Sequence, residues 1–231
     1  LLQLLSLLLM QLPVETESES IHREKFSVLS ALKLRGQKQS LVLGQHRSYQ
    51  SIPGVKNNSK SPTFAALRLF LDQQEWYQVP IYIRTGKMLK QKHTYVVVEF
   101  KKHPFQKNLP DIEMNKLILE LQPQERLHLK LFTKVGGSQN QFHDLTTTES
   151  LACFGDDCLP EHGRLLLNVF QNDHRHFLDF EEIIATWKFT DKLLQFAYEQ
   201  KVPVILYEDY SSGPNQQYKI PKQDGFEWYD A

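Results

Sequence analysis

The spacing of apolar residues changes several times along the chain, and each change predicts a different element. Residues 1–12 read LLQLLSLLLMQL, which predicts a short helix that is apolar on nearly all sides and ends at Pro13. The acidic residues 14–20 predict a loop. In residues 21–34, IHREKFSVLSALKL, apolar positions recur at helical spacing and predict a second helix. Residues 35–60 are rich in Gly, Ser and Asn, which predicts another loop.

A serine followed by proline, Ser61-Pro62, is typical of a helix start, because serine can cap the helix and proline fits its first position. We therefore predict a helix over residues 62–78, PTFAALRLFLDQQEWYQ, with apolar residues at helical spacing. The pattern then becomes that of a strand over residues 81–83, followed by a turn at Gly86.

The middle of the chain predicts a sheet. Residues 94–100, TYVVVEF, and 117–121, LILEL, are rich in the residue types that strands favour. Residues 126–131, RLHLKL, alternate without error between leucine and basic side chains. Such alternation is typical of an antiparallel sheet with one buried face.

Helical patterns return near the end of the chain. One helix is predicted over residues 163–172. A second begins at Asp179, where Glu182 stands three residues on as in a capping box, and continues to about Gln200.

The last residues predict a short strand over 202–207 and a tail, 211–231, that lies over the surface. The order is therefore helices, then strands with an intervening helix, then helices. This order predicts one α+β domain over residues 1–231 rather than a regular βαβ series.

Composition and charge exclude several classes of protein. The 231 residues carry 27 Lys+Arg and 27 Asp+Glu, so the formal net charge is zero and no basic excess indicates nucleic-acid binding. The apolar run at residues 1–12 is too short to span a membrane. Cys153 and Cys158 are too few for a disulfide framework, and their spacing is unusual for zinc. We interpret them as thiols in a reducing cytosol.

Motifs for a complete active site are missing. The sequence holds no G-x-G dinucleotide fingerprint, no P-loop and no local nucleophile motif. His174 and His176 stand two residues apart without a carboxylate–histidine motif around them, so we predict a surface or capping role and no metal. The chemistry alone does not indicate a whole enzyme.

One basic cluster could bind an anion. The stretch RTGKMLKQK, residues 84–92, places four basic residues around Gly86 directly after a strand. Lysine ammonium groups there could meet a sugar phosphate, since lysine offers three donors on a compact charge. The same pattern also fits a solvated basic turn, so both interpretations stay open on spacing alone.

A longer pattern around this cluster resembles the glucose-6-phosphate dehydrogenase family. Residues 63–89 read TFAALRLFLDQQEWYQVPIYIRTGKML, against a family pattern of a TFAALRLFIDNWRW-like segment followed by VPFYLRTGK. Other pieces that resemble the family follow in the same order: GQHRSY at 44–49, Pro53-Gly54-Val55, Leu121-Gln122-Pro123, GRLLLN at 163–168, Trp187 with Asp191, and Tyr210 to Pro214. The resemblance covers nearly the whole chain.

The resemblance implies a fold and a function. It implies the family's C-terminal domain, an α+β domain with a large, mainly antiparallel sheet that is backed by helices and forms a homodimer. The family oxidises glucose 6-phosphate to 6-phosphogluconolactone with NADP in the cytoplasm, as part of the oxidative pentose phosphate pathway. The Rossmann coenzyme domain, which binds NADP, and the catalytic base lie upstream in the family. We therefore expect this chain to be a piece of a longer enzyme, without catalytic residues and inactive alone.

The resemblance also implies substrate-binding residues. The lysine of RTGK is Lys87, and the family uses it, with a basic residue five positions later, here Lys92, to hold glucose 6-phosphate. Gln122 of the QP turn is a weaker third candidate. Some family members bind a second, structural NADP on this domain, but Glu120 and His128 here replace an arginine and a tyrosine of that site.

Two alternatives to an enzyme fragment remain. The chain could be a free-standing, non-catalytic dimerisation or regulatory module derived from the family. It could also be a sugar-phosphate binder, although we expect weak or undetectable affinity for glucose 6-phosphate because the family's phosphate ligands lie mostly upstream.

Overall fold

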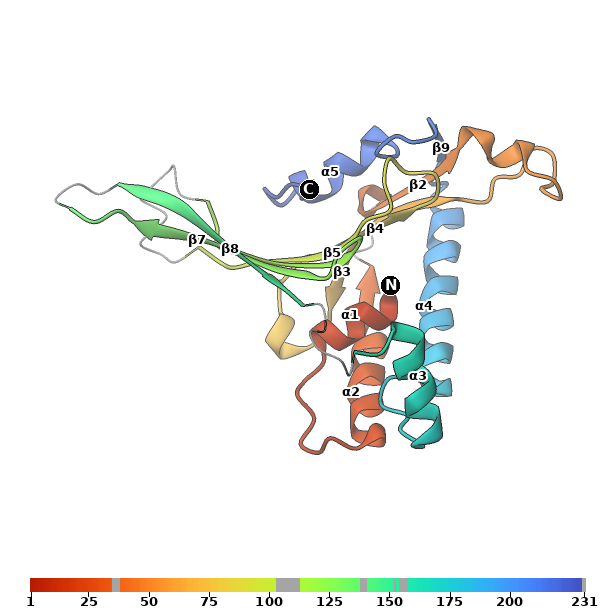
Figure 1. Cartoon of the computed structure of the whole chain (residues 1–231). Coiled ribbons are helices and arrows are strands. Elements are labelled where there is room, and N and C mark those ends of the chain that lie inside the picture. Colours follow the sequence, from red (N-terminus) through yellow and green to blue (C-terminus); the bar gives the residue numbers. More distant parts are fainter. Residues whose placement is uncertain (35–37, 103–112, 138–140, 152, 154–157, 230–231) are drawn as a thin grey trace. The chain divides into compact units, whose positions relative to one another are not determined.

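The structure, a computed structural model, divides the chain into two compact units. Unit 1 comprises residues 1–90 and 159–228, and unit 2 comprises residues 91–158 and 229–231. Figure 1 shows the elements of both units, which are described separately below. The residues that the structure describes are 1–34, 38–102, 113–137, 141–151, 153 and 158–229.

Within its described residues, unit 1 combines five α-helices with a five-stranded sheet. Figure 1 shows how these elements follow one another along the chain. The α-helices are α1 (Leu2–Leu9), α2 (Ser18–Ala31), α3 (Glu161–Phe170), α4 (Phe180–Glu199) and α5 (Lys219–Lys222). The strands are β1 (Leu32–Leu34), β2 (Leu41–His46), β3 (Phe64–Leu71), β4 (Ile81–Gly86) and β9 (Val204–Tyr207). Short 3-10 helices lie at Lys38–Ser40, Arg47–Ser51, Gln74–Trp76 and Asn215–Tyr218.

Strand β3 is the centre of this sheet. It pairs antiparallel with β1, β2 and β4, and β2 in turn pairs with β9 in parallel. The helix predicted over residues 62–78 is therefore wrong: its first half is a strand. The cause is burial on both faces, which removes the alternation that normally marks a strand.

The two faces of β3 pack against different parts of unit 1. Leu67 and Leu69 belong to a core formed with α2 and α4, in which Val28 and Phe189 are buried. Phe64 and Ala66 belong to a second core with Tyr207 and Ile220. In the primary sequence these two sets interleave into one apolar run, which has the spacing of a helix as well.

The predicted helices are largely confirmed, with shifted ends. The helix predicted over 21–34 begins at Ser18 and ends at Ala31, since Leu32–Leu34 form β1. The helix predicted from Asp179 is α4, and the Asp179 side chain accepts a hydrogen bond from the backbone N–H of Glu181 at 3.4 Å. The predicted capping box is wrong, because Glu182 is fully buried and pairs with Lys25 of α2.

Two segments predicted to lack structure contribute to the core. Strand β2, Leu41–His46, is buried at every position, although residues 35–60 were expected to form a loop; residues 35–37 lie outside the described part. The tail was expected to lie over the surface, yet Gln217 and Ile220 are fully buried. The buried stretches within both segments are short, and neither shows a periodic pattern that reveals its burial.

Unit 2 is an antiparallel sheet in the order β5-β6-β7-β8. Its strands are β5 (Thr94–Glu99), β6 (Lys116–Gln122), β7 (Arg126–Lys134) and β8 (Phe142–Ser150), of which the sequence did not predict β8. The expected single buried face is not found: among the described strand residues only Ile118 is fully buried. The α+β class is confirmed, with two sheets in place of one.

Leucine and valine side chains nevertheless share one face of unit 2. Val96 is opposite Leu119, and Leu119 is opposite Leu127, so these side chains lie on the same face of the sheet. We call this set the apolar sheet face: Val96, Val98, Leu117, Leu119, Leu127, Leu129, Leu131 and Leu145. All of its members are half-buried or exposed.

Candidate functional site

Lys87 follows the last residue of β4, and its backbone is held from two sides. Its N–H donates to the carbonyl of Thr63 at 2.9 Å, and its carbonyl accepts from the hydroxyl of Tyr207 at 2.7 Å. Tyr207 is buried, and burial raises the pKa of its phenol, which keeps the hydroxyl protonated as a donor. The Lys87 side chain itself is exposed. A fixed backbone with an exposed side chain suits a lysine that binds an anionic or hydroxyl-rich ligand.

Glycines let this turn approach its neighbours closely. A Cβ atom at Gly86 would lie 2.6 Å from Cδ2 of Phe64, and one at Gly213 would lie 2.7 Å from Cε2 of the same ring. Gly213 also has φ +93°, which disfavours any side chain there. The buried Phe64 ring therefore contacts both glycine backbones and packs edge-on against Tyr207 at 5.8 Å between centroids. This packing fixes the position of the backbone that leads into Lys87.

We expect Gly86→Ala to destabilise unit 1 by about 1–3 kcal/mol, because the new methyl group overlaps a buried ring that cannot retreat. Gly163→Ala is the matched control: its Cβ would meet nothing nearer than 3.6 Å, within helix α3, where alanine is favoured over glycine. Urea unfolding of both variants measures the difference. Equal stabilities would contradict the tight contact between Gly86 and Phe64.

The residues after Lys87 are tied to the segment that follows β9. The carbonyl of Met88 accepts from the N–H of Tyr210 at 2.7 Å, and the N–H of Lys90 donates to the carbonyl of Ser211 at 2.9 Å. Sequence reasoning missed Thr63 and Tyr207 as supports of Lys87. Nothing in their spacing could have revealed them, since the contacts join residues far apart in the chain.

Arg84 differs from the lysines of the basic cluster. Its guanidinium lies over the ring of Trp228, 4.8 Å from the centroid, and Nη1 donates to the Gln217 side-chain oxygen at 3.4 Å. Arg84 therefore helps to hold the C-terminal segment. The exposed cations of the cluster within unit 1 are Lys87 and Lys90.

The other two predicted substrate ligands lie in unit 2. Gln122 ends β6 and is exposed, and its register partner is Thr94, whose hydroxyl donates to the Gln122 side-chain oxygen at 3.3 Å. Lys92 is exposed and stands two residues before Thr94. The structure thus brings Lys92 and Gln122 to one end of the unit 2 sheet, while Lys87 belongs to unit 1.

Glu120, which the resemblance places at an arginine position of the family's structural NADP site, lies between two histidines. Its Oε1 is 3.2 Å from Nε2 of His93, and its Oε2 is 3.4 Å from Nε2 of His128. Nδ1 of His128 lies 2.9 Å from the hydroxyl of Thr148. Both imidazoles thus contact one carboxylate, and a carboxylate repels an anionic ligand.

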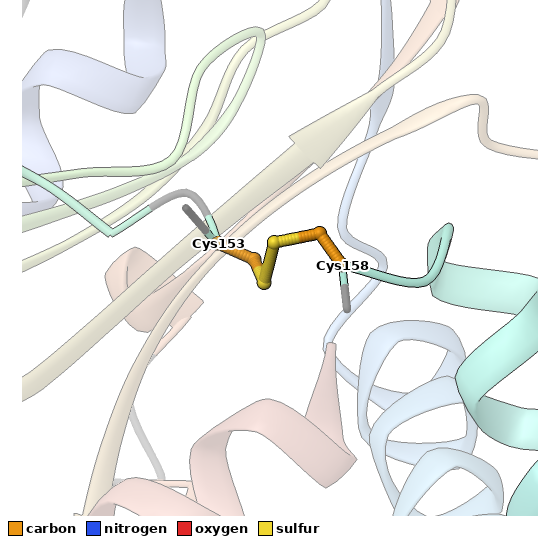
Figure 2. Close-up of a disulfide and its surroundings, with 2 residues drawn as sticks. All are labelled: Cys153 and Cys158. Atoms are coloured by element: carbon orange, nitrogen blue, oxygen red, sulfur yellow. A yellow bond between two sulfur atoms is a disulfide. The ribbon is translucent and has the colours of Figure 1, made fainter. Parts of the chain in front are cut away.

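The two cysteines are bonded to each other, which corrects their interpretation as free thiols (Figure 2). Cys153 and Cys158 form a disulfide with their Cα atoms 5.7 Å apart, a separation within the usual range for disulfides. They therefore no longer argue for a reducing compartment. Across the described residues, no group of three His, Cys, Asp or Glu side chains is placed to hold a metal ion.

His174 and His176 bond to asparagines. Nε2 of His174 lies 3.0 Å from the side-chain oxygen of Asn172, and Nδ1 of His176 lies 2.9 Å from the side-chain nitrogen of Asn168. Both histidines are exposed, which agrees with the predicted surface role.

Residues 1–229 match the family model described as "Glucose-6-phosphate dehydrogenase, C-terminal domain". The chain belongs to the glucose-6-phosphate dehydrogenase family. The chloroplastic glucose-6-phosphate 1-dehydrogenase of Spinacia oleracea is 32% identical over 249 residues, covering 100% of this chain and 43% of the relative. The glucose-6-phosphate 1-dehydrogenase of Bacillus subtilis is 28% identical, and the match covers 100% of this chain and 50% of that relative.

Solved structures of glucose-6-phosphate dehydrogenases share the fold. The enzyme from Mycobacterium avium superimposes with a TM-score of 0.79 at 28% identity, covering 100% of this chain and 48% of that one. A glucose-6-phosphate dehydrogenase in complex with its substrate glucose 6-phosphate superimposes with a TM-score of 0.84 at 26% identity. That match covers 99% of this chain and 49% of the other. The chain thus spans about half the length of the relatives that it matches, and the resemblance seen in its RTGK segment is confirmed.

Proposed function

We propose that this chain is the substrate-binding and dimer-forming part of a glucose-6-phosphate dehydrogenase, which oxidises glucose 6-phosphate to 6-phosphogluconolactone with NADP in the oxidative pentose phosphate pathway. The observation that carries this proposal is the RTGK turn, with the Lys87 backbone held by Thr63 and Tyr207 and its ammonium group exposed. Lys87, Lys92 and Gln122 hold and orient the sugar phosphate. Proton abstraction and hydride transfer belong to a coenzyme-binding half that carries NADP and the catalytic base.

We propose that the described part of unit 2 does not hold a second, structural NADP. The carboxylate of Glu120 would repel the phosphates, and its contacts with His93 and His128 occupy the nearby imidazoles. We assign no coenzyme contact to the described residues of this chain.

In the longer enzyme, Lys87→Ala is expected to raise KM for glucose 6-phosphate by about 10–150-fold with little change in kcat, because a charge-assisted hydrogen bond contributes about 1.5–3 kcal/mol to binding. Steady-state kinetics at saturating NADP measures the effect. Lys90→Ala removes an exposed lysine from the same turn and serves as the matched control. A similar loss in both variants would mean that the turn acts only through its overall charge.

The deciding experiment is to determine the DNA sequence directly upstream of the Leu1 codon. The longer protein encoded by that segment together with this chain is then expressed. The proposal expects a Rossmann fingerprint there, and a longer protein that reduces NADP with glucose 6-phosphate. An independent start codon just upstream would instead favour the alternative, a non-catalytic dimerisation or regulatory module. The 231-residue chain alone should show no dehydrogenase activity.

Calorimetry separates these proposals from a sugar-phosphate binder. We expect weak or undetectable binding of glucose 6-phosphate to the chain alone. A micromolar Kd that vanishes in Lys87→Ala would contradict this expectation and would make the chain a binding protein in its own right.

The apolar sheet face supports a homodimer. It presents leucine and valine side chains of all four strands in unit 2, none of them fully buried. Burial of such a face against a second copy is favourable because it removes apolar area from water. Sedimentation equilibrium is expected to show a dimer that Leu129→Lys disrupts, whereas Lys130→Gln, on the opposite face, leaves it intact. A clean monomer at high concentration would contradict the dimer.

We propose a cytoplasmic location. Relatives include a cytoplasmic form in Arabidopsis thaliana and the chloroplastic form in Spinacia oleracea. In the part of the chain that the structure describes, no helix has the length and apolar character needed to cross a membrane.

A further inference from the structure

Helix α4 carries apolar residues on two opposite sides. The inner side packs into the core of unit 1 through Ala185, Phe189 and Ala197, all buried. The outer side is a stripe of exposed residues that we call the outer seam: Phe180, Ile184, Trp187, Asp191, Leu194 and Tyr198. Trp187 is 62% exposed and Tyr198 is 85% exposed.

The spacing of the outer seam is that of a helix-docking surface. Its members follow at intervals of four, three, four, three and four residues, which keeps them on one side of the helix over its whole length. A helix that is apolar on both sides is normally covered on both sides. Helix α3 adds exposed apolar residues of its own, Leu166, Val169 and Phe170.

Asp191 decides which kind of partner fits. It stands near the middle of the outer seam, is exposed, and forms no ion pair with any described residue of the chain. If two copies paired through their outer seams, two carboxylates would be brought together and desolvated, which is costly. A different helix with a basic side chain opposite Asp191 would satisfy the charge and cover the apolar residues.

We propose that the outer seam docks an amphipathic helix of the coenzyme-binding half, with a lysine or arginine of that helix facing Asp191. This inference rests on the proposed function, which pairs the chain with such a half. The matched relatives are about twice as long as this chain, so they contain enough further polypeptide to supply the helix. The docking fixes the two halves relative to each other through α4.

Hydroxyl-radical footprinting, which reports the solvent accessibility of single side chains, tests the proposal on the 231-residue chain and on the longer protein encoded with its upstream segment. Oxidation of Trp187 and Tyr198 should be strong in the chain and fall several-fold in the longer protein. Phe189, buried on the inner side of the same helix, should be protected in both and serves as the internal reference. Equal oxidation of Trp187 in the two proteins would overturn the proposal.

A charge reversal tests the partner's chemistry. Asp191→Lys should lower the Tm of the longer protein by a few degrees and leave the Tm of the 231-residue chain unchanged. Lys192→Asp, a reversal on the next residue outside the seam, should change neither. If Asp191→Lys is neutral in the longer protein, no cation faces Asp191 and the proposal fails. If the longer protein has dehydrogenase activity but its outer seam stays exposed, only this inference is contradicted. If the outer seam is covered but the longer protein is inactive, only the proposed function is contradicted.

Discussion

Replacing Lys25 by methionine should destabilise unit 1 by about 3–5 kcal/mol, because the substitution leaves a carboxylate buried without its cation. Lys25 and Glu182 are 1% and 0% exposed, and Nζ of Lys25 lies 2.9 Å from Oε1 of Glu182. Nζ also donates to the carbonyl of Phe177 at 3.2 Å. Among the described residues, no donor forms a hydrogen bond with the second carboxylate oxygen of Glu182. The remaining imidazole contact, from His22, is a weaker substitute for a lysine.

Urea unfolding of three variants tests this account of the ion pair. Lys25→Met combined with Glu182→Leu removes both charges and should recover most of the lost stability, since two apolar side chains of suitable size can replace a buried pair. Arg23→Met removes the neighbouring surface pair with Glu19 and should cost less than about 1 kcal/mol. If Lys25→Met alone were as mild as Arg23→Met, the Lys25–Glu182 pair would be accessible to water in solution.

The pair also shows where sequence reasoning reached its limit in the helices. Helix α2 was predicted from apolar spacing, and α4 was predicted from a helix start at Asp179, because both kinds of pattern are local in the sequence. Glu182 was assigned to a capping box, because its distance from Asp179 fits that motif. Its real partner, Lys25, is far away in the sequence. A local pattern cannot reveal a contact of that kind.

The sheets divide in the same way. β5, β6 and β7 were predicted because alternation or β-branched runs mark them. β3 was mistaken for a helix because Leu67 and Leu69 face one core while Phe64 and Ala66 face another. Burial on both faces removes the period of two that would have identified the strand.

The candidate site was reached through resemblance rather than periodicity. Spacing alone left two interpretations of Lys87 open: a ligand-binding residue or part of a solvated turn. The structure adds the supports that make the turn rigid, Thr63 and Tyr207, which come from segments on either side of the β-rich middle. Those supports depend on pairing across the fold and have no signature of their own in the sequence.

The second large effect concerns the C-terminal tail, which Asp224 fastens to the sheet. Asp224→Ala should cost about 2–4 kcal/mol, below the full range for a buried pair because 20% of the Asp224 side chain is exposed. Arg68 of β3 is 5% exposed, and its Nε donates to Oδ2 of Asp224 at 2.6 Å while Nη2 donates to Oδ1. The hydroxyl of Tyr82, on β4, donates to the same carboxylate. Without the Asp224 carboxylate, the guanidinium of Arg68 and the hydroxyl of Tyr82 both lose their hydrogen-bond acceptor.

Urea unfolding measures the loss, and limited proteolysis reports whether the tail detaches. Glu227→Ala is the matched control in the same tail, because its contact with Lys222 is 3.7 Å long and both side chains are more than half exposed. We expect that control to behave as wild type. A tail that is cleaved equally fast in wild type and Asp224→Ala would show that Asp224 does not fasten it.

The same cluster has a pH signature through Tyr82. Burial, followed by the hydrogen bond to Asp224, raises the pKa of Tyr82 above its ordinary value of 10.0. The folded state therefore holds the phenolic proton more tightly than the unfolded state does, so the stabilisation is complete below pH 10 and declines as the pH rises further. Comparison with Tyr82→Phe isolates this group. The free energy by which wild type is more stable than Tyr82→Phe should fall above pH 10 by up to about 1.4 kcal/mol per pH unit. An advantage that stays constant between pH 8 and 11 would place the Tyr82 hydroxyl in water, away from Asp224.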